Sequence, residues 1–247
     1  MTAPVFVVES LEGAAPGALL TLDGPEGRHA VSVRRLQSGE EIVLTDGQGR
    51  AAAGTVQRTE GKDKLFVEAA ELLTEPEPSP RITVVQALPK GDRGELAVET
   101  MTETGVDAIV PWAASRCITQ WKGERGVKSL GKWRATAREA GKQSRRLRFP
   151  PVAELASTKQ VAALLAEADF AGVLHETGSE PLASAELPAS GSVVLVVGPE
   201  GGVSPQELES FAAAGALPYR LGPSVLRTST AGTAAAALLL GRSGRWG

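Results

Sequence analysis

A glycine-rich segment, Gly198-Pro199-Glu200-Gly201-Gly202, directly follows the apolar run 193–197. The next residues, Ser204-Pro205-Gln206-Glu207, have the serine–glutamate spacing and the early proline that are typical of a helix N-terminus. Glycines let backbone approach a ligand without a Cβ in the way, so that N–H and C=O groups can bond to it. The pattern favours a strand, a ligand-binding loop and a helix, and a tight structural turn is the alternative for the loop.

A second segment that could do chemistry is LGPSVLRTSTA at 221–231, which ends a short strand and leads into an alanine-rich helix at 231–240. Its hydroxyl groups can simply cap that helix, which is the structural alternative. The helix consists mostly of small residues, which permit close backbone packing. Such packing suits a crowded or threaded C-terminus.

Two familiar nucleotide-binding loops are absent from the sequence. Neither G-x-x-x-x-G-K-[ST] nor a G-x-G-x-x-G after a strand occurs in 81–247, so ATP and NAD chemistry lose their main support. Asp46-Gly47-Gln48-Gly49 lies between short strands and predicts a hairpin turn. With one cysteine, Cys117, and two histidines, His29 and His175, there is no cluster at metal-ligand spacing, and we expect no metal.

Basic residues are concentrated in one stretch of the chain. Residues 116–148 hold eleven Lys/Arg and two Asp/Glu, a balance of +9, whereas the whole chain has a net charge of -3. This asymmetry favours a phosphate-binding surface over a merely solvated helix face. Trp121 and Trp133 in the same stretch could stack on bases, but the helix that carries Trp133 must bury one side, so a core position is expected for Trp133.

The elements that must position these residues fall into two parts. The proline-rich segment 75–80 reads as a semi-rigid linker between 1–74 and 81–247. Short strands are expected before the linker, together with a helix at 26–36 that brings several basic residues close together. These expected strands are 5–8, 18–22, 41–45, 51–57 and 65–69. The first part is therefore predicted to be a small β-rich domain.

After the linker, apolar runs alternate with helical stretches. The expected strands are 82–87, 108–110, 171–174 and 193–197, and the expected helices lie near 93–104, 127–145, 157–168 and 204–214. This alternation predicts an α/β domain with a mostly parallel sheet, in which ligands bind beyond the carboxyl ends of the strands. Met1-Thr2-Ala3-Pro4 shows no secretory pattern and the apolar run 234–240 is too short to cross a bilayer, so we expect a cytoplasmic protein and no membrane contact.

These motifs together resemble a known family. The strand–GPEGG–S-x-x-E segment and LGPSVLRTSTA are similar to the C-terminal signature of SPOUT methyltransferases, particularly the 16S rRNA uracil-N3 methyltransferases. Further segments that resemble this family are QALPK at 86–90, E-x-G-V-D at 103–107, 133–140, 143–150 and 28–40. The resemblance covers nearly the whole chain.

The resemblance implies a PUA-like RNA-binding domain at 1–74, a linker at 75–80 and a SPOUT methyltransferase domain at 81–247. It also implies a deep trefoil knot in the C-terminal parallel sheet, a homodimer, and S-adenosylmethionine held by backbone groups of three loops. Carried onto this chain, the cofactor-binding residues are Leu174, His175, Glu176, Gly198, Pro199, Glu200, Gly201, Gly202, Leu221, Gly222, Val225, Leu226, Arg227, Thr228, Ser229 and Thr230. Many relatives have an acidic residue where this chain has Ser229, so a role for that carboxylate has no counterpart here.

The chemistry implied by the resemblance needs the weakly acidic N3 proton of uracil to leave and the developing negative charge to be stabilised. Arg146 and Arg227 are the candidates for catalytic contacts. His29 and His175 are conceivable bases, although a structural role is favoured for each, and Glu200 either orients the cofactor or braces its loop. The expected RNA-binding residues are Arg28, His29, Arg34, Arg35, Lys142, Gln143, Arg145, Arg146 and Arg148.

The resemblance thus implies an enzyme that methylates N3 of a specific uridine in 16S rRNA of the small ribosomal subunit and needs no metal. A SPOUT methyltransferase acting on another rRNA site or on tRNA is the nearer alternative. The other alternative is a non-catalytic RNA-binding assembly factor with a decayed cofactor loop. The intact GPEGG and LRT segments speak against that decay.

Overall fold

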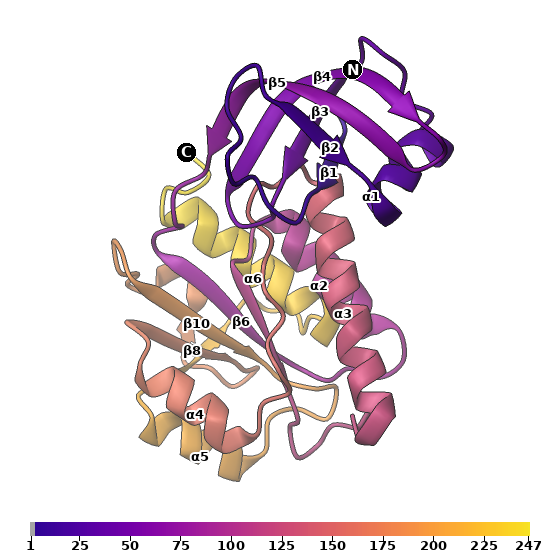
Figure 1. The fold of residues 1–247 in the computed structure, drawn as a ribbon. Helices are drawn as coiled ribbons and strands as arrows, with labels where there is room; N and C mark the ends of the chain where they lie inside the picture. Colours follow the sequence, from indigo (N-terminus) through magenta and orange to yellow (C-terminus); the bar gives the residue numbers. More distant parts are fainter. Residues whose placement is uncertain (1–2) are drawn as a thin grey trace. The chain divides into compact units, whose positions relative to one another are not determined.

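The computed structural model describes residues 3–247; Met1 and Thr2, part of the segment inspected for a secretory pattern, lie outside the described residues. The chain separates into two compact units (Figure 1). The first unit comprises Met1–Glu77 and Gly141–Phe149, and the second comprises Pro78–Ala140 and Pro150–Gly247. The sequence-based division differs from these units at one place, because it assigned 141–149 to the C-terminal domain.

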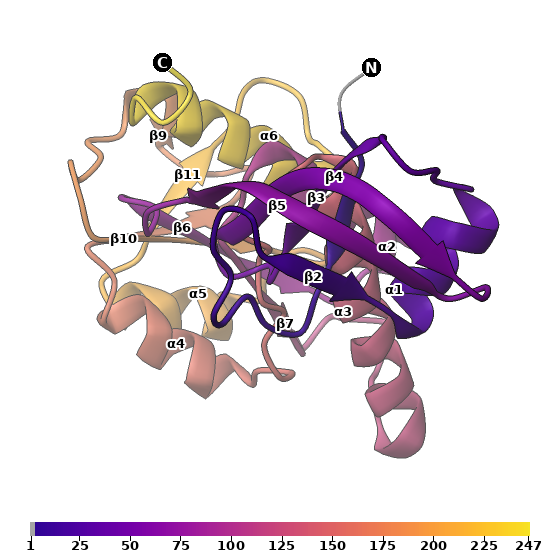
Figure 2. The same ribbon diagram turned by 45° about the horizontal axis from the view of Figure 1, so that its top comes forward.

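The first unit is built on a five-stranded sheet with the order β1-β3-β4-β5-β2. Its strands are β1 (Val5–Val7), β2 (Leu19–Leu22), β3 (Glu41–Thr45), β4 (Arg50–Glu60) and β5 (Lys64–Thr74). Only β1 and β3 pair in parallel, and β4 and β5 form a long antiparallel ribbon with two register shifts (Figure 2). All five expected strands are present, and residues 46–49 form the expected turn between the antiparallel strands β3 and β4.

The helix predicted at 26–36 has different bounds. Helix α1 (Gly24–Arg28) begins with a proline in its first turn and passes directly into a π-helix, η1 (His29–Val33). The helical path ends before Arg35, which has a φ of 56° that a continuing helix does not allow. The helix propensities and the hydrophobic pattern of these residues do not predict such a change of backbone conformation.

The segment Gly141–Phe149 belongs to the first unit because it bonds to the β3–β4 turn. The N–H of Gly49 donates to the carbonyl of Leu147 at 2.9 Å, and the N–H of Phe149 donates to the carbonyl of Gly47 at 2.8 Å. The last residues of helix α3 (Gly123–Gln143) and the residues after it are thus held on the first sheet.

The second unit contains a six-stranded sheet in which every pairing is parallel, with the order β7-β6-β10-β8-β11-β9. The strands are β6 (Arg81–Ala87), β7 (Ala108–Trp112), β8 (Phe170–Leu174), β9 (Glu180–Pro181), β10 (Ser192–Val197) and β11 (Leu217–Arg220). The helices are α2 (Arg93–Thr104), α3, α4 (Thr158–Ala166), α5 (Pro205–Ala213), α6 (Thr228–Arg242) and the 3₁₀ turn η2 (Leu182–Ser184). The parallel α/β sheet predicted for this part is confirmed.

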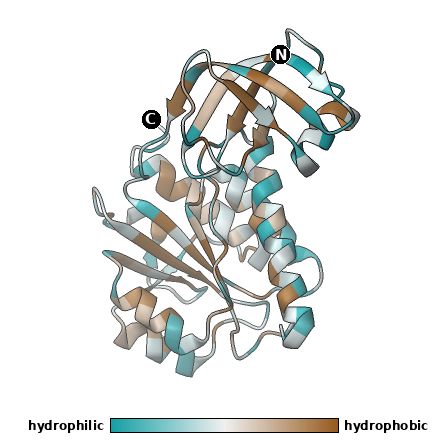
Figure 3. Ribbon diagram, viewed as in Figure 1, coloured by the Kyte–Doolittle hydropathy of each residue, from teal (hydrophilic) through white to brown (hydrophobic). Residues whose placement is uncertain are grey.

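Helices cover both faces of this sheet, with α2 and α6 on one side and α4 and α5 on the other (Figure 1). Successive side chains of a strand point to opposite faces, so Val84 packs with α2 and α6 whereas Val85 packs with α4 and α5. The central strands are accordingly mostly apolar: β10 is apolar after Ser192, and β6 is interrupted only by Arg81, Thr83 and Gln86 (Figure 3). This double coverage is why the strand segments read as continuous apolar runs.

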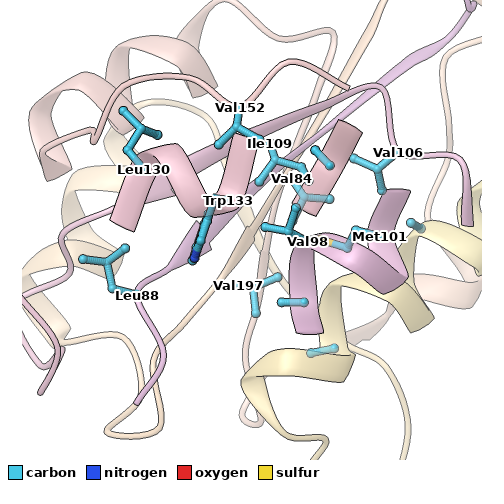
Figure 4. Packing of buried hydrophobic residues seen from close by; sticks show 14 residues of the cluster. Val84, Leu88, Val98, Met101, Val106, Ile109, Leu130, Trp133, Val152 and Val197 are labelled. Atoms are coloured by element: carbon cyan, nitrogen blue, oxygen red, sulfur yellow. The ribbon is translucent and has the colours of Figure 1, made fainter. Parts of the chain in front are cut away.

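The core beside α2 contains Trp133, which is 2% exposed and lies near Leu88 and Val98 (Figure 4). The prediction that Trp133 is a core residue is confirmed. Trp121 packs edge-to-face on it with ring centroids 4.9 Å apart, so both tryptophans serve the packing of α3.

Candidate functional site

Three loops at the carboxyl ends of neighbouring strands line one pocket of about 540 Å³ in the second unit. Strands β10, β8 and β11 are adjacent and parallel, so the loops that follow them meet at one edge of the sheet. The structure brings together nearly all the residues expected to hold the cofactor. Those that line the pocket are Leu174, His175, Glu176, Gly198, Pro199, Glu200, Gly201, Gly202, Leu221, Gly222, Val225, Leu226, Arg227 and Thr228.

Two of the expected cofactor residues, Ser229 and Thr230, are not among the lining residues. Ser229 is 3% exposed in the first turn of α6, and the Thr230 hydroxyl donates to the carbonyl of Arg227 at 3.1 Å. Both side chains belong to the start of the helix. Neither hydroxyl caps the helix, because the N-cap residue of α6 is Arg227 and no side chain bonds to the N–H groups of the first turn there. The capping alternative is therefore wrong for these two residues.

The glycine loop after β10 is shaped by close backbone packing. A Cβ on Gly201 would lie 3.1 Å from the Cβ of Arg116, and Gly202 has a φ of +72°, which favours glycine. The N–H of Gly202 donates to the carbonyl of Pro199 at 2.9 Å, which closes a tight turn. The loop is thus both a tight turn and a wall of the pocket, so the two sequence-based readings are compatible.

A buried chain of hydrogen bonds joins two of the pocket loops to the sheet. The amide Nε2 of Gln86, at the end of β6, donates to the Thr228 hydroxyl at 3.0 Å, and that hydroxyl donates to the carbonyl of Gly198 at 2.7 Å. The first residue of α6 is therefore locked to the first residue of the glycine loop.

Glu200 and His175 have partners within the second unit. Glu200 Oε1 accepts from the backbone N–H of Lys90 at 3.1 Å and lies 3.9 Å from Arg93 Nη1, so the side chain braces its loop. His175 Nδ1 accepts from the backbone N–H of Thr177 at 3.2 Å and lies 2.8 Å from the hydroxyl of the same residue. These contacts are those of loop-shaping side chains.

Sequence reasoning missed three arginines of the pocket wall, Arg93, Arg116 and Arg220. Arg220 is the last residue of β11. Arg93 and Arg116 follow β6 and β7, at the same edge of the sheet as the three predicted loops. Applying the carboxyl-end argument to these two strands as well would have pointed to both residues.

The expected RNA-binding residues all belong to the first unit, although they come from segments more than a hundred residues apart. The Nζ of Lys142 lies 2.9 Å from Glu26 Oε1 in α1 and 5.9 Å from the ring centre of Phe6. This packing places the segment Gly141–Phe149 beside α1. The basic residues of 28–35 and of 142–148 are therefore parts of one compact unit.

Within this group, three side chains are engaged in the packing of the unit. Lys142 is only 7% exposed in its ion pair, and His29 packs edge-on against Phe6 with centroids 5.6 Å apart. Arg148 Nη1 lies 2.9 Å from Glu77 Oε1, and its Nη2 donates to the carbonyl of Glu75 at 3.1 Å. These placements argue for structural roles and against phosphate contacts.

The other members of the group are more accessible. Arg146 is half-buried, and the exposed side chains are Arg28, Arg34, Arg35, Gln143 and Arg145. Arg35 and Arg145 have φ values of 56° and 59°, in the left-handed region that non-glycine residues rarely adopt. Of the two candidate catalytic arginines, Arg227 is exposed on the wall of the pocket, whereas Arg146 belongs to the first unit.

Neither a metal-binding cluster nor a membrane-spanning helix is found in the part of the chain that the structure describes. Residues 3–247 contain no group of three or more His, Cys, Asp or Glu side chains that could hold a metal ion. None of the helices within this range is long and apolar enough to cross a membrane.

Comparison with family models assigns both parts of the chain. The model of an RNA methyltransferase domain matches residues 75–240, and the model of an RNA methyltransferase PUA domain matches residues 22–69. The first match includes every loop of the pocket.

Known proteins resemble the chain over its full length. The ribosomal RNA small subunit methyltransferase E of Mycobacterium bovis is 44% identical over 250 residues, covering 100% of this chain and 94% of that protein. The protein of the same name from Bacillus subtilis is 30% identical, with 85% of each chain covered. A putative methyltransferase of Legionella pneumophila, solved with bound SAM, superposes with a TM-score of 0.86 at 29% identity and covers 98% of both chains. The methyltransferase E of Neisseria gonorrhoeae, bound to S-adenosyl methionine, gives 0.85 at 28% identity and 98% coverage of both chains.

Proposed function

The chain belongs to the RNA methyltransferase family, and on that premise we propose that it transfers the methyl group of S-adenosylmethionine to N3 of a uridine in 16S rRNA. The observation that carries this proposal is the meeting of the three predicted cofactor loops around one pocket. The similar protein of Mycobacterium bovis is named as a methyltransferase of small-subunit ribosomal RNA, and two similar structures were solved with S-adenosylmethionine bound.

The pocket fits S-adenosylmethionine in size and in the groups it presents. Its volume of about 540 Å³ lies in the range of small-molecule sites. The wall formed by Gly201 and Gly202 leaves the backbone accessible, because no side chain projects from these residues. When bound, this cofactor supplies a methyl group already activated by a positively charged sulfur, so no metal is needed for the transfer.

We assign the stabilisation of charge on the base to Arg227. Its guanidinium is exposed on the pocket wall, one residue before the Thr228 hydroxyl that fixes the start of α6 to Gly198. As the N3 proton of uracil leaves, negative charge develops on the base, and a preplaced cation lowers the energy of that state. We propose that Arg146, in the first unit, contacts the base or a neighbouring phosphate.

We further propose that the first unit binds RNA. Along the chain we propose an RNA-binding domain at 1–74, a linker at 75–80 and a methyltransferase domain at 81–247, with the segment Gly141–Phe149 joining the first unit. The match to a PUA domain at 22–69 supports this role. Guanidinium groups bind phosphate oxygens in bidentate fashion, and a cluster of them gives salt-dependent affinity. The proposed contacts come from the accessible side chains Arg28, Arg34, Arg35, Gln143, Arg145 and Arg146.

Three further features are proposed with this activity: a trefoil knot, a homodimer and action in the cytoplasm on the small ribosomal subunit. The path of the C-terminus supports the knot. After β11, near one end of the sheet order, the chain returns to α6, which packs on α2 and on β6 near the other end. The small residues along α6 allow that close approach.

Mass spectrometry of nucleosides in 16S rRNA from a strain lacking the gene tests this proposal. We expect loss of one N3-methylated uridine and its return when the wild-type gene is restored. Loss of a methyl group from another rRNA or from tRNA would favour the nearer alternative. Unchanged modification of all RNAs, together with defective subunit assembly, would favour the non-catalytic assembly factor.

A further inference from the structure

Glu207, on the first turn of α5, holds a buried carboxylate that reaches beyond its own helix. The residue is 4% exposed. Its Oε2 accepts from the backbone N–H and the hydroxyl of Ser204 at 3.0 and 2.7 Å, which is the capping arrangement read from the sequence. The same carboxylate also accepts from the backbone N–H of Ser115 at 2.7 Å and from the Ser115 hydroxyl at 3.0 Å.

The bonds to Ser115 are more than helix capping requires. Burial raises the pKa of the Glu207 carboxyl, but the N–H and O–H donors of Ser115 and Ser204 outweigh it and lower the pKa below its ordinary value. A buried charge is tolerated when donors of this kind surround it. The carboxylate therefore stays ionised and fixes the loop after β7 to the start of α5.

The residue after Ser115 contacts the glycine loop. Arg116 Nη1 donates to the carbonyl of Gly201 at 3.1 Å, and the backbone and Cβ of Arg116 lie so close to Gly201 that a side chain there would crowd them. Both Arg116 and Gly201 line the pocket, whereas Glu207 does not. A continuous set of contacts thus runs from Glu207 through Ser115 and Arg116 to the pocket wall.

We propose that Glu207 is a positioning residue for the cofactor pocket. By fixing Ser115 it sets Arg116, and Arg116 holds the carbonyl of Gly201 so that the loop 198–202 keeps the shape that binds S-adenosylmethionine. This inference rests on the proposed function, because it takes S-adenosylmethionine as the ligand. Beyond the proposed function, we infer that the affinity for the cofactor depends on the Glu207 carboxylate, which lies outside the pocket.

Calorimetric titration of the full chain with S-adenosylmethionine, combined with thermal unfolding, tests the inference. Glu207→Gln replaces two acceptor oxygens by one acceptor and one donor, so it cannot satisfy both serines. We expect it to weaken cofactor binding about tenfold, the size of one lost hydrogen bond to a charged group. Ser115→Ala, a milder change that keeps the backbone N–H bond, should weaken binding in the same direction.

A control exists at a third donor to the carboxylate. The Thr158 hydroxyl, at the start of α4, donates to Glu207 Oε1 at 3.3 Å and accepts from Trp112 Nε1 at 3.2 Å. Its removal leaves the bonds from Ser115 and Ser204 to the carboxylate in place. Thr158→Val should therefore lower the melting temperature and leave cofactor affinity unchanged. Equal weakening by Thr158→Val and Ser115→Ala would mean that loss of stability alone moves the affinity, and would overturn the inference.

A double-mutant cycle with Arg116 separates the proposed route from other effects. In an Arg116→Ala background, Glu207→Gln should lose its effect on cofactor affinity while still lowering the melting temperature. Arg116→Lys, which keeps a donor, should recover part of the affinity lost in Arg116→Ala. A full tenfold effect of Glu207→Gln in the Arg116→Ala background would contradict the route.

The proposed function and this inference fail in different ways. A wild-type chain that does not bind S-adenosylmethionine would overturn both. A wild-type chain that binds it, with unchanged affinity in both Glu207→Gln and Ser115→Ala, would overturn the positioning role alone.

Discussion

The hydroxyl of Thr228 donates a 2.7 Å hydrogen bond to the carbonyl of Gly198, thirty residues earlier in the chain. Two loops that stand apart in the sequence are thereby fixed to each other at the pocket. Gln86 donates to the same hydroxyl from the end of β6, so the bond is oriented from within the sheet. Hydrogen bonds from the side chains of Gln86 and Thr228 thus fix the loops of the pocket. The glycine loop itself contributes no side chain from Gly201 or Gly202 to the pocket wall.

The first prediction concerns that wall. Gly201→Val should abolish binding of S-adenosylmethionine while the protein stays folded, because a Cβ at this position already crowds Arg116 and branching adds volume. Calorimetry and circular dichroism measure the two properties. Gly241→Val, on α6 where a Cβ meets no neighbour within 4 Å, is the control and should bind normally. Wild-type affinity in Gly201→Val would remove this loop from the cofactor site.

RNA affinity should depend on exposed arginines of the first unit. The double reversal Arg35→Glu with Arg145→Glu should weaken RNA binding and reduce the slope of log K against log salt by about 0.7–0.9 for each lost phosphate contact. Cofactor affinity should not change. Lys159→Glu, an exposed position on α4 in the second unit, controls for the change in net charge of one such reversal. A loss of slope in this control equal to that of either single reversal would show that the effect is not local to the first unit.

Lys142 is expected to act on stability. Lys142→Met removes the ammonium that lies 2.9 Å from the largely buried Glu26 carboxylate and should reduce the free energy of unfolding by about 1–3 kcal/mol. Combining it with Glu26→Gln removes the negative charge of the pair as well and should recover part of the loss. Urea denaturation measures both. If Lys142→Met left stability intact and lowered the salt slope of RNA binding, Lys142 would be a phosphate contact after all.

The pH dependence of stability should reveal the Glu207 carboxylate. Its pKa in the folded chain is lowered from an ordinary value of 4.5, so its contribution to stability is present above that value and is lost as the pH falls through the lower folded value. The difference in unfolding free energy between the wild type and Glu207→Gln should therefore shrink below about pH 4.5. Urea denaturation between pH 3.5 and 7 gives this difference, and a constant gap across the range would contradict the shift.

The sequence was most informative where the rules are local. Continuous apolar runs predicted β6, β8 and β10, and the serine–glutamate spacing predicted the start of α5 at Pro205. The glycine loop could be placed because it follows a strand directly. Strand β9 was not predicted, because a strand of two residues, one of them proline, is too short to show an alternating hydrophobic pattern.

Long-range contacts could not be predicted in this way. The attachment of Gly141–Phe149 to the β3–β4 turn depends on backbone hydrogen bonds across about a hundred residues, which no local pattern records. The basic residues of this segment looked alike in the sequence. Only the fold distinguishes Lys142, buried beside Glu26, from the exposed Arg145. The contacts from Glu207 through Ser115 to Arg116 could not be predicted either, because Ser115 and Glu207 lie far apart in the sequence.

The central claim is tested most directly by methyl transfer in vitro. Purified protein is incubated with isotopically labelled S-adenosylmethionine and small ribosomal subunits from the deletion strain, and the 16S rRNA is digested for nucleoside mass spectrometry. We predict label in 3-methyluridine at one position, and a single-turnover rate in Arg227→Ala that falls more than its RNA affinity does. No label in the rRNA, or label only in a different nucleoside, would contradict the proposed function.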